Sequence, residues 1–312
     1  MSIKTARAEG TANVTIDHAA CVACGLCVRV CIGAPLYMAD GKVHVDQSRY
    51  FGCFGCGQCV AVCPQDCITV EGRDFSPDDV LPLPPRNERA AYSQLHALLL
   101  GRRSVRDFKD KPVERALIDQ IIATASTAPI GLPPSDVQIL VFDGQDKVAA
   151  LSTDLLDLMR SIRWLFSPLV RAVMRPFLSK ENNEVFDTFL APALETFLQK
   201  QAEGEDWLTY KAPLAMYFFT SVYADPVDPL VVATYAMLAA ESLGLGSCML
   251  GMPAYCFKYS KKLRRKYGLA GKSQQGILVI FGYPAVPYRR ALHRRLGEVR
   301  YYEDPPPDSL RI

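Results

Sequence analysis

The sequence lacks the features that mark membrane-spanning, exported and nucleic-acid-binding proteins. Its longest uncharged stretches, among them residues 242–257, are shorter than a membrane span and are interrupted by glycine and proline. The first ten residues, MSIKTARAEG, have no apolar centre of the kind found in signal peptides. The net charge of +2 gives no global attraction to nucleic acid. We therefore expect a cytoplasmic protein of 312 residues with no nucleic-acid partner, long enough for two domains.

Histidine is also scarce. The chain has only four, at positions 18, 44, 96 and 293, and each stands apart from the others. No Ser-His-Asp or Cys-His catalytic arrangement is visible in the pattern. We assign no catalytic side chain and expect any difficult chemistry to belong to a cofactor.

Cysteine, by contrast, is abundant and regularly spaced. Eight of the eleven cysteines form two blocks with the spacing C-x2-C-x2-C-x3-C. Bacterial ferredoxins use this spacing for [4Fe–4S] clusters, and in two-cluster proteins the fourth cysteine of each block serves the other cluster. We therefore expect one cluster on Cys21, Cys24, Cys27 and Cys63, and a second on Cys53, Cys56, Cys59 and Cys31.

Zinc and disulfides are the alternatives for these cysteines. Paired C-x2-C motifs also hold structural zinc, but a tetrahedral ion has no use for a third cysteine at the same step. Disulfides are disfavoured because nothing resembling a secretory segment precedes the blocks, and so many thiols favour a reducing cytoplasm. Cys67 is a ninth thiol in this region, which we interpret as a small buried side chain under the cluster.

The segment from Thr15 to Val70 is similar to two-cluster bacterial ferredoxins. Short strands are expected at residues 14–16, 43–45 and 68–70, with a turn at Gly41. We predict a ferredoxin-like domain at residues 1–75 that the clusters hold together. A linker follows at residues 76–90, where four prolines favour a stiff, extended chain.

The remainder, residues 91–312, alternates helical and strand patterns. Helices are expected after Tyr92 and at residues 114–127 and 230–243, and buried strands at 139–142, 214–219, 247–250 and 277–281. Residues 151–212 form a long insertion with a helical apolar stripe and several arginines. We interpret it as core or as a lid over a pocket, and we do not favour membrane contact because Pro168 and Pro176 interrupt the stripe.

Arginines gather at two places in this part of the chain. Arg102, Ser104 and Arg106 alternate on a predicted loop, and guanidinium and hydroxyl groups at this step suit a phosphate and its neighbouring polyol. Arg290, with Arg294 and Arg295 after it, is the second basic group. Gly251 follows a strand, where bare backbone N–H groups can approach a flat ring.

Together these features resemble the FMN-dependent nitroreductase family, on the motifs RRSVRDF, Ala-Pro at 128–129, LAAESLGLGSCMLG at 238–251 and Gly-Tyr-Pro at 282–284. The resemblance implies an α+β fold and a homodimer with FMN at its interface. It implies that Arg102 and Ser104 hold the phosphate and ribityl chain and that Arg106 lies near flavin N1 and O2. Pro133 and Ser135 stand where the family often has Asn and Gln, so Ser135 or Asp136 is the candidate substitute. The residues expected at FMN are Arg102, Arg103, Ser104, Arg106, Leu250, Gly251, Arg290 and Arg294, with Pro129, Ile130, Gly131 and Ser135 lining the ring from the second subunit.

We interpret the chain as an iron–sulfur flavoprotein oxidoreductase with a ferredoxin-like module and a nitroreductase-like α+β domain. Electrons would pass from a low-potential donor through two [4Fe–4S] clusters to FMN and then to a small acceptor, such as a nitroaromatic, a quinone or a conjugated carbonyl. Enoate or dehalogenating reduction with the same cofactors remains open, as does a non-enzymatic electron-transfer or redox-sensing role. A basic helix expected at residues 258–266 is a candidate docking surface for an acidic ferredoxin or flavodoxin donor.

Overall fold

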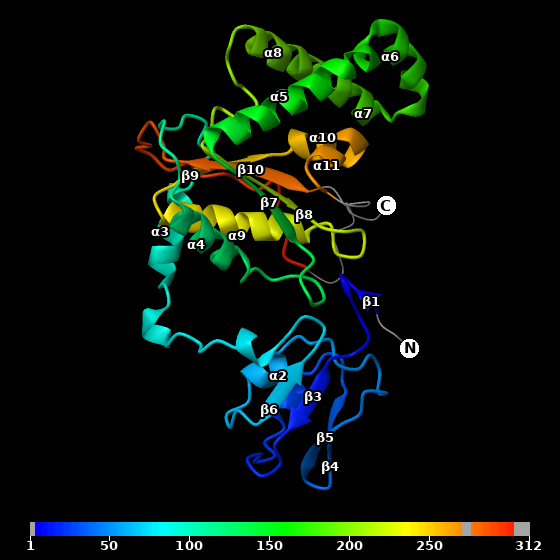
Figure 1. The fold of residues 1–312 in the computed structure, drawn as a ribbon, viewed down its shortest axis with the longest axis vertical. Coiled ribbons are helices and arrows are strands. Elements are labelled where there is room, and N and C mark those ends of the chain that lie inside the picture. The colour runs from blue at the N-terminus through cyan, green and yellow to red at the C-terminus, as the bar shows by residue number, and fades with distance from the viewer. Residues whose placement is uncertain (1–3, 270–275, 303–312) are drawn as a thin grey trace.

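The computed structural model describes residues 4–269 and 276–302. The chain forms an N-terminal module, residues 4–75, and a C-terminal domain, residues 91–302, joined by an exposed linker (Figure 1). The ends of the predicted domains at 1–3 and 303–312 lie outside the described residues. Within the described ranges, no helix has the length and apolar character needed to cross a membrane.

The N-terminal module is a repeat of short strands and single-turn helices. Its elements are β1 (Lys4–Thr5), β2 (Ala8–Glu9), β3 (Asn13–Ile16), α1 (Leu26–Arg29), β4 (Leu36–Ala39), β5 (Lys42–Val45), α2 (Gln58–Ala61) and β6 (Ile68–Glu71). Strand β3 pairs with β6, and β4 pairs with β5 through a turn at Asp40 and Gly41, both with positive φ. Ile68 and Val70 of β6 both point into a small core that includes several cysteines, whereas Thr69 between them is exposed. The predicted strands at 14–16, 43–45 and 68–70 are confirmed.

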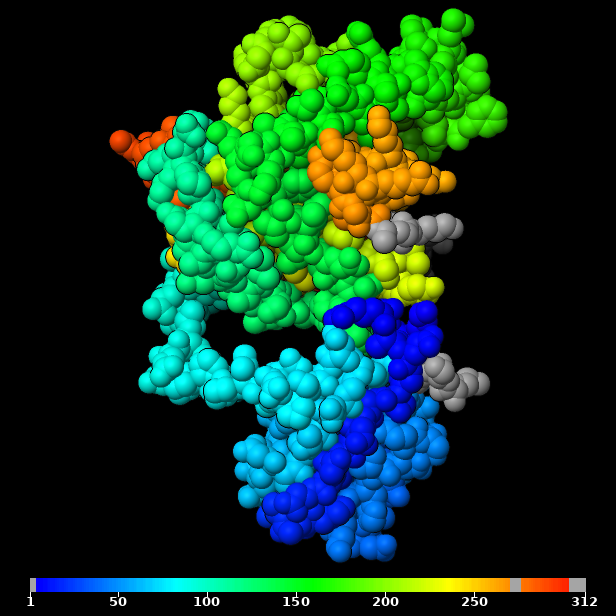
Figure 2. All heavy atoms as spheres, in the orientation of Figure 1, coloured from blue at the N-terminus to red at the C-terminus, as the bar shows by residue number. Residues whose placement is uncertain are grey.

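The linker is almost entirely exposed and contains two short 3₁₀ turns, Pro77–Asp79 and Arg86–Glu88. It leaves the module at the left of the view in Figure 1 and runs up to α3, the first helix of the C-terminal domain, on the side away from β1. In Figure 2 the linker runs along the outside of the molecule, and the module meets the C-terminal domain next to the N-terminal residues.

The C-terminal domain is built on one antiparallel sheet with helices on both faces. The sheet has the order β7–β8–β10–β9, from β7 (Gln138–Asp143), β8 (Leu214–Phe219), β10 (Ile277–Gly282) and β9 (Gly246–Leu250). One face carries α3 (Tyr92–Gly101), α4 (Arg115–Ala125) and α9 (Asp228–Ser242), and the other carries α5 (Gln145–Ser161), α10 (Met252–Tyr259) and α11 (Lys261–Lys266) (Figure 1). The predicted α+β arrangement is confirmed.

The two central strands, β8 and β10, are buried on both faces. Because side chains alternate along a strand, Met216 and Phe218 pack with α4 and α9, whereas Tyr217 packs with α5 and α10. Each face therefore has its own apolar cluster, and the sheet is the rigid centre of the domain.

The insertion differs from the predicted continuous stripe. Its helix α5 begins at Gln145, before the predicted boundary, and its first turns are core: Leu151 and Leu155 are fully buried. Beyond Ser161 the chain breaks into short elements and the stripe turns outward, leaving Leu169 82% and Phe177 86% exposed. These elements are η3 (Arg163–Phe166), α6 (Pro168–Met174), η4 (Arg175–Phe177), α7 (Lys180–Val185), η5 (Phe186–Leu190) and α8 (Ala191–Ala202). Pro168 and Pro176 each lie in the first turn of a new element, α6 and η4, so no continuous helix runs through these two positions.

The predicted basic helix at 258–266 is also divided. Ser260 ends α10 and caps α11 by accepting a hydrogen bond from the Leu263 amide. Lys266 pairs with Asp154 and Arg264 donates to the Phe257 carbonyl, so part of the positive charge is used internally. Both helices lie on the C-terminal domain beside α5, away from the module (Figure 1).

Candidate functional site

The two cysteine blocks adopt the same backbone conformation. Each places a glycine with left-handed φ, Gly25 or Gly57, directly before its short helix. In each block the amide two residues after the first cysteine approaches that cysteine's sulfur, with N–Sγ distances of 3.4 Å for Ala23 and for Gly55. An amide pointed at a sulfur stabilises a thiolate, so both blocks are shaped alike for anionic sulfur ligands.

The structure brings the eight cysteines together in two groups of four. Each group lines its own cavity, with about 340 Å³ of space not filled by protein atoms, part of it open to solvent. We call the cavities site I and site II. Site I is lined by Cys21, Cys24, Cys27 and Cys63, and site II by Cys53, Cys56, Cys59 and Cys31.

The donor chemistry and the surroundings of both cavities fit iron–sulfur clusters. Four cysteine sulfurs per cavity are the ligand set of a [4Fe–4S] cluster. Apolar side chains complete the lining, among them Val43 and Ile68 at site I and Leu36 and Phe54 at site II. Within residues 4–269 and 276–302, no three His, Cys, Asp or Glu side chains are arranged to hold a single metal ion. In each cavity the four cysteines line one common space, which is the arrangement that a cubane requires.

Burial controls the protonation of the free thiols. It raises the pKa of Cys59 to about 12, with further increases from the neighbouring cysteines, and it raises the pKa of Cys27 and Cys53 as well. These groups would hold protons near neutral pH, so a bound metal must displace them.

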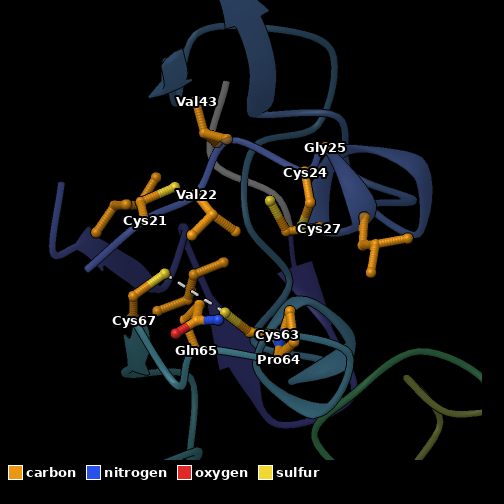
Figure 3. A pocket seen from close by; sticks show the side chains of 13 residues that line it. Cys21, Val22, Cys24, Gly25, Cys27, Val43, Cys63, Pro64, Gln65 and Cys67 are labelled. Atoms are coloured by element: carbon orange, nitrogen blue, oxygen red, sulfur yellow. Dashed lines mark hydrogen bonds between the residues drawn. The ribbon is translucent and has the colours of Figure 1, made fainter. Parts of the chain in front are cut away.

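Cys67 lies at site I, in line with the expectation of a buried thiol under the cluster. It lines the same cavity, and its Sγ is 3.4 Å from Cys63 Sγ (Figure 3). Figure 3 shows Cys21, Cys24, Cys27, Cys63 and Cys67 around one space, to which Cys67 comes from the segment just before β6.

The second candidate site lies where residues 102–108 run along β9. Ser104 forms a parallel bridge with Ser247, and the Val105 amide donates to the Ser247 carbonyl at 3.0 Å. Gly246 makes this approach possible, because a Cβ there would lie 2.5 Å from Val105 Cγ2. The loop is thereby attached to the strand that ends at Leu250.

Charged and polar groups converge on this loop. Arg106 lies over the Tyr210 ring, 5.8 Å from its centroid. Arg106 and Ser104 also lie near the Cys248 thiol. Burial raises the pKa of this thiol, and the charge of Arg106 and a hydrogen bond with Ser104 partly offset the increase. Burial raises the pKa of Glu241, while Arg102 and Arg103 lower it. The guanidinium groups and the Ser104 hydroxyl form a donor-rich surface that fits a phosphate.

The C-terminal segment after β10 is attached to the same loop. Phe108 bridges Pro284, and Arg103 Nη2 donates to the Arg290 carbonyl at 3.1 Å. Arg290 is therefore adjacent through its main chain. Among the described residues, no hydrogen bond or ion pair joins Arg294 to the loop. Leu250 and Gly251 close β9 two and three residues beyond Cys248, with Gly251 exposed.

The structure does not bring the predicted ring-lining loop to the arginines within one chain. The Gly131 amide donates to Asp228, the first residue of α9, at 3.2 Å, whereas Arg102 and Arg103 lie near Glu241, close to the last residue of the same helix. Helix α9 has 15 residues and is about 22 Å long. Pro129, Ile130, Gly131 and Ser135 therefore lie at the opposite end of the domain.

Asp136, one of the two substitutes considered for the ring edge, is excluded. It is buried, and its carboxylate accepts hydrogen bonds from the Ser221 amide at 3.1 Å and the Thr220 hydroxyl at 3.4 Å. Ser135 is the remaining candidate. Its hydroxyl accepts from the Val137 amide, and its carbonyl accepts from Arg7.

The sequence did not reveal the contacts of four residues beside these sites. Glu241 and Cys248 lie within the block 238–251 that carried the family resemblance, so their neighbourhood was visible although their contacts were not. Tyr210 is placed against Arg106 by the turn at residues 206–211. Arg73, a buried cation near site II, follows the last strand of the module and belongs to no motif.

The fold, the sulfur cavities and the arginine loop together define an oxidoreductase that combines a flavin with iron–sulfur clusters. The chain belongs to the nitroreductase family, whose profile matches residues 99–283, more than half of its length. A 4Fe-4S dicluster domain matches residues 13–64. The protein is therefore an FMN-dependent oxidoreductase with an N-terminal iron–sulfur domain.

Individual relatives are distant. No curated protein matches the chain. A nitroreductase with bound FMN from Desulfitobacterium hafniense DCB-2 is 16% identical over 67% of this chain and 98% of its own, with a TM-score of 0.49. A nitroreductase with bound FMN from Bacteroides fragilis NCTC 9343 is 17% identical over 67% and 99%, with a TM-score of 0.48. A mutant of the FMN and NADPH-dependent nitroreductase NfnB from sphigopyxis sp. strain HMH is 21% identical over 67% and 99%, with a TM-score of 0.48.

Proposed function

We propose that the protein takes single electrons from a low-potential donor protein, passes them through two [4Fe–4S] clusters, and delivers them from FMN to a small organic acceptor. The observation that carries this proposal is the pair of four-cysteine cavities on a module attached to a family domain that uses FMN. FMN, when bound, converts one-electron supply into two-electron reduction of the acceptor.

The chain's own residues have defined parts in this proposal. The crossed sets of cysteines hold one cluster each, in sites I and II. Arg102 and Ser104 bind the phosphate end of FMN, with the Arg290 and Arg294 segment closing over it. Arg106 contributes positive charge at the N1 and O2 edge, where reduction builds negative charge. The Leu250 and Gly251 amides face N5 and O4.

We propose further that the working form is a homodimer. The ring-lining loop and the arginine loop lie at opposite ends of α9, so a second copy has to supply one of them to a complete site. Exposed apolar side chains on α3 and on the C-terminal segment are available for this contact: Tyr92 is 79% exposed and Leu296 is 76% exposed. Burial of both in a dimer would cover this apolar surface.

The assignment of the flavin site is tested by Arg102→Ala, with Arg115→Ala as the matched control. Arg115 is an exposed arginine on α4 that pairs only with Asp119 in the described contacts. Loss of a desolvated charge contact costs about 3 kcal/mol, or about a hundredfold in the FMN dissociation constant. We expect Arg102→Ala to be purified without FMN but with unchanged iron, and Arg115→Ala to keep both. Full flavin content in Arg102→Ala would show that the phosphate site is misplaced.

The acceptor class is tested with the same preparations. Nitroaromatics, quinones, conjugated carbonyls and halogenated aromatics are offered to donor-reduced protein, and flavin reoxidation is followed without oxygen. A rate increase with one class identifies the reaction. Equal, slow reoxidation with all four would contradict a small-molecule reductase.

A further inference from the structure

The N-terminal module contacts the C-terminal domain through the ring-lining loop. The Thr5 hydroxyl donates to the Pro133 carbonyl at 3.0 Å, and Arg73 Nη2 donates to the same carbonyl at 3.2 Å. Arg7 Nε donates to the Ser135 carbonyl at 3.0 Å. Two backbone carbonyls of residues 129–135 are thereby held by side chains of the module.

A further contact lies on the same side. The Lys4 ammonium is 4.4 Å from the centroid of the Tyr223 ring, in the segment that leads into α9. Because the ring-lining loop also bonds to the first residue of α9, the module's contacts gather at the N-terminal end of that helix. The chain's own Arg102 loop lies about 22 Å away, at the other end.

Site II is the cluster site that faces this contact. Arg73 is 8% exposed, and its Nε donates to the carbonyl of Phe54, the residue after Cys53, at 3.1 Å. Gly55, the next residue, approaches the Arg73 side chain closely. A single guanidinium therefore touches both the site II loop and the Pro133 carbonyl of the flavin-lining segment.

Both cavities reach solvent, but site I lies apart from this contact. Cys24 is exposed, and the neighbouring Val22 is 61% exposed, so this site opens to solvent. None of its lining residues, which belong to residues 16–68, takes part in the contacts to Pro133, Ser135 or Tyr223. A donor protein can reach site I without displacing the C-terminal domain.

We propose that electrons enter the module at site I, leave from site II, and reduce the FMN held by the arginine loop of the second copy, which this chain's own 129–135 loop lines. The proposal rests on the proposed function and on its homodimer. For each flavin reduced, two donor molecules lose one electron each, and the flavin gains both electrons and one proton from water. Arg73 is a positioning residue that holds site II against the loop.

Two mixed dimers of full-length chains, separated by two affinity tags, distinguish this route from transfer within one chain. In the first, one chain carries Arg102→Ala and the other carries Cys53→Ser and Cys56→Ser. Its only flavin is lined by the loop of the chain whose site II is intact. In the second, a wild-type chain is paired with a chain carrying all three substitutions. Its only flavin is lined by the loop of the chain without site II.

A bacterial two-[4Fe–4S] ferredoxin, reduced chemically and freed of excess reductant, is mixed with each dimer under anaerobic conditions. We expect flavin bleaching at the wild-type rate in the first dimer and its loss in the second. The reverse result, or equal rates in both, would overturn the route. A chemical reductant that reaches flavin directly should bleach both equally. If the wild-type homodimer is not bleached by ferredoxin, or the chain is monomeric, the proposed function itself fails.

Arg73→Met, with Arg29→Met as an exposed control on α1, tests the positioning role by a readout other than activity. We expect faster amide hydrogen exchange at residues 129–137 and slower ferredoxin-driven bleaching, with iron, FMN and direct chemical reduction unchanged. Arg73→Lys, which keeps the charge and one donor, should recover part of both losses. Unchanged exchange and bleaching in Arg73→Met would overturn the assignment.

Discussion

Gly246→Ala should displace the arginine loop and weaken FMN binding. A Cβ on Gly246 would lie 2.5 Å from Val105 Cγ2 and 2.8 Å from Val105 Cβ. Val105 is 2% exposed and β-branched, so it can neither move into solvent nor rotate easily to another rotamer. The loop itself must move away from β9, which stretches the bond from the Val105 amide to the Ser247 carbonyl.

The cost follows from overpacking a filled contact. Such changes cost about 1–3 kcal/mol, and if FMN binds only the undisplaced loop, its dissociation constant rises about 5- to 150-fold. The assay is titration of FMN-free protein with FMN, followed by flavin fluorescence, together with thermal unfolding of the FMN-free form. Iron content should not change, because the cysteine cavities lie in the other unit.

Two controls make the result specific. Arg115→Ala changes an exposed side chain on α4 that pairs with Asp119, and it should bind FMN as wild type does. Combining Gly246→Ala with Val105→Ala removes the contacts to the two Val105 methyl groups but leaves the contact to Cβ at 2.8 Å, so it should recover only part of the lost affinity. Wild-type FMN affinity and stability in Gly246→Ala would refute the claim that this contact positions the loop.

Three further predictions concern the cysteine cavities, the carboxylate of Asp206 and the basic residues on α10 and α11. Cys63→Ser should impair the site I cluster, Cys31→Ser should impair the site II cluster, and Cys67→Ser should leave both clusters intact. Iron content and electron paramagnetic resonance measure the outcome, and loss of a cluster in Cys67→Ser would contradict the ligand sets. Burial pushes the pKa of Asp206 upward, but hydrogen bonds from Thr209, Lys211 and Ser152 lower it overall, so its stabilising effect is present above the unfolded pKa of about 4 and is lost as pH falls through the lower folded value. Asp206→Asn should therefore lower the unfolding temperature at neutral pH, with the difference from wild type narrowing below about pH 4, and a constant difference would contradict the assignment. Joint replacement of Lys258, Lys261 and Lys262 by Ala should leave ferredoxin-driven flavin reduction unchanged, because α10 and α11 lie away from the module (Figure 1); a large loss of rate would restore the docking role first considered for this segment.

The iron–sulfur part of the account was accessible from sequence because its information is local. The first three cysteines of each block are separated by only two residues from one to the next, so they lie on one loop. The repeat of the whole block is visible in the sequence without any tertiary structure. The crossing of Cys31 and Cys63 follows from known two-cluster spacing. The strands at 43–45 and 68–70 were found because their alternating residues match a half-buried sheet.

Other features depend on contacts between distant segments, which the sequence does not reveal. The apolar stripe of the insertion continues past Ser161, yet Leu169 and Phe177 are exposed, because a periodic pattern does not say whether a partner surface exists. The contact between Arg73 and Pro133 joins residues 60 positions apart. Ser260 was read as part of one basic helix because its role as a cap depends on how α10 ends.

The most direct measurement of the central claim compares wild type with the full-length Cys53→Ser, Cys56→Ser variant, both loaded with FMN. Anaerobic mixing with reduced ferredoxin is followed at the flavin absorbance maximum, and a parallel experiment uses a small chemical reductant. The account predicts rapid flavin bleaching by ferredoxin in wild type, its loss in the variant, and equal bleaching of both by the chemical reductant. Bleaching of the variant by ferredoxin at the wild-type rate would contradict electron flow through the iron–sulfur module.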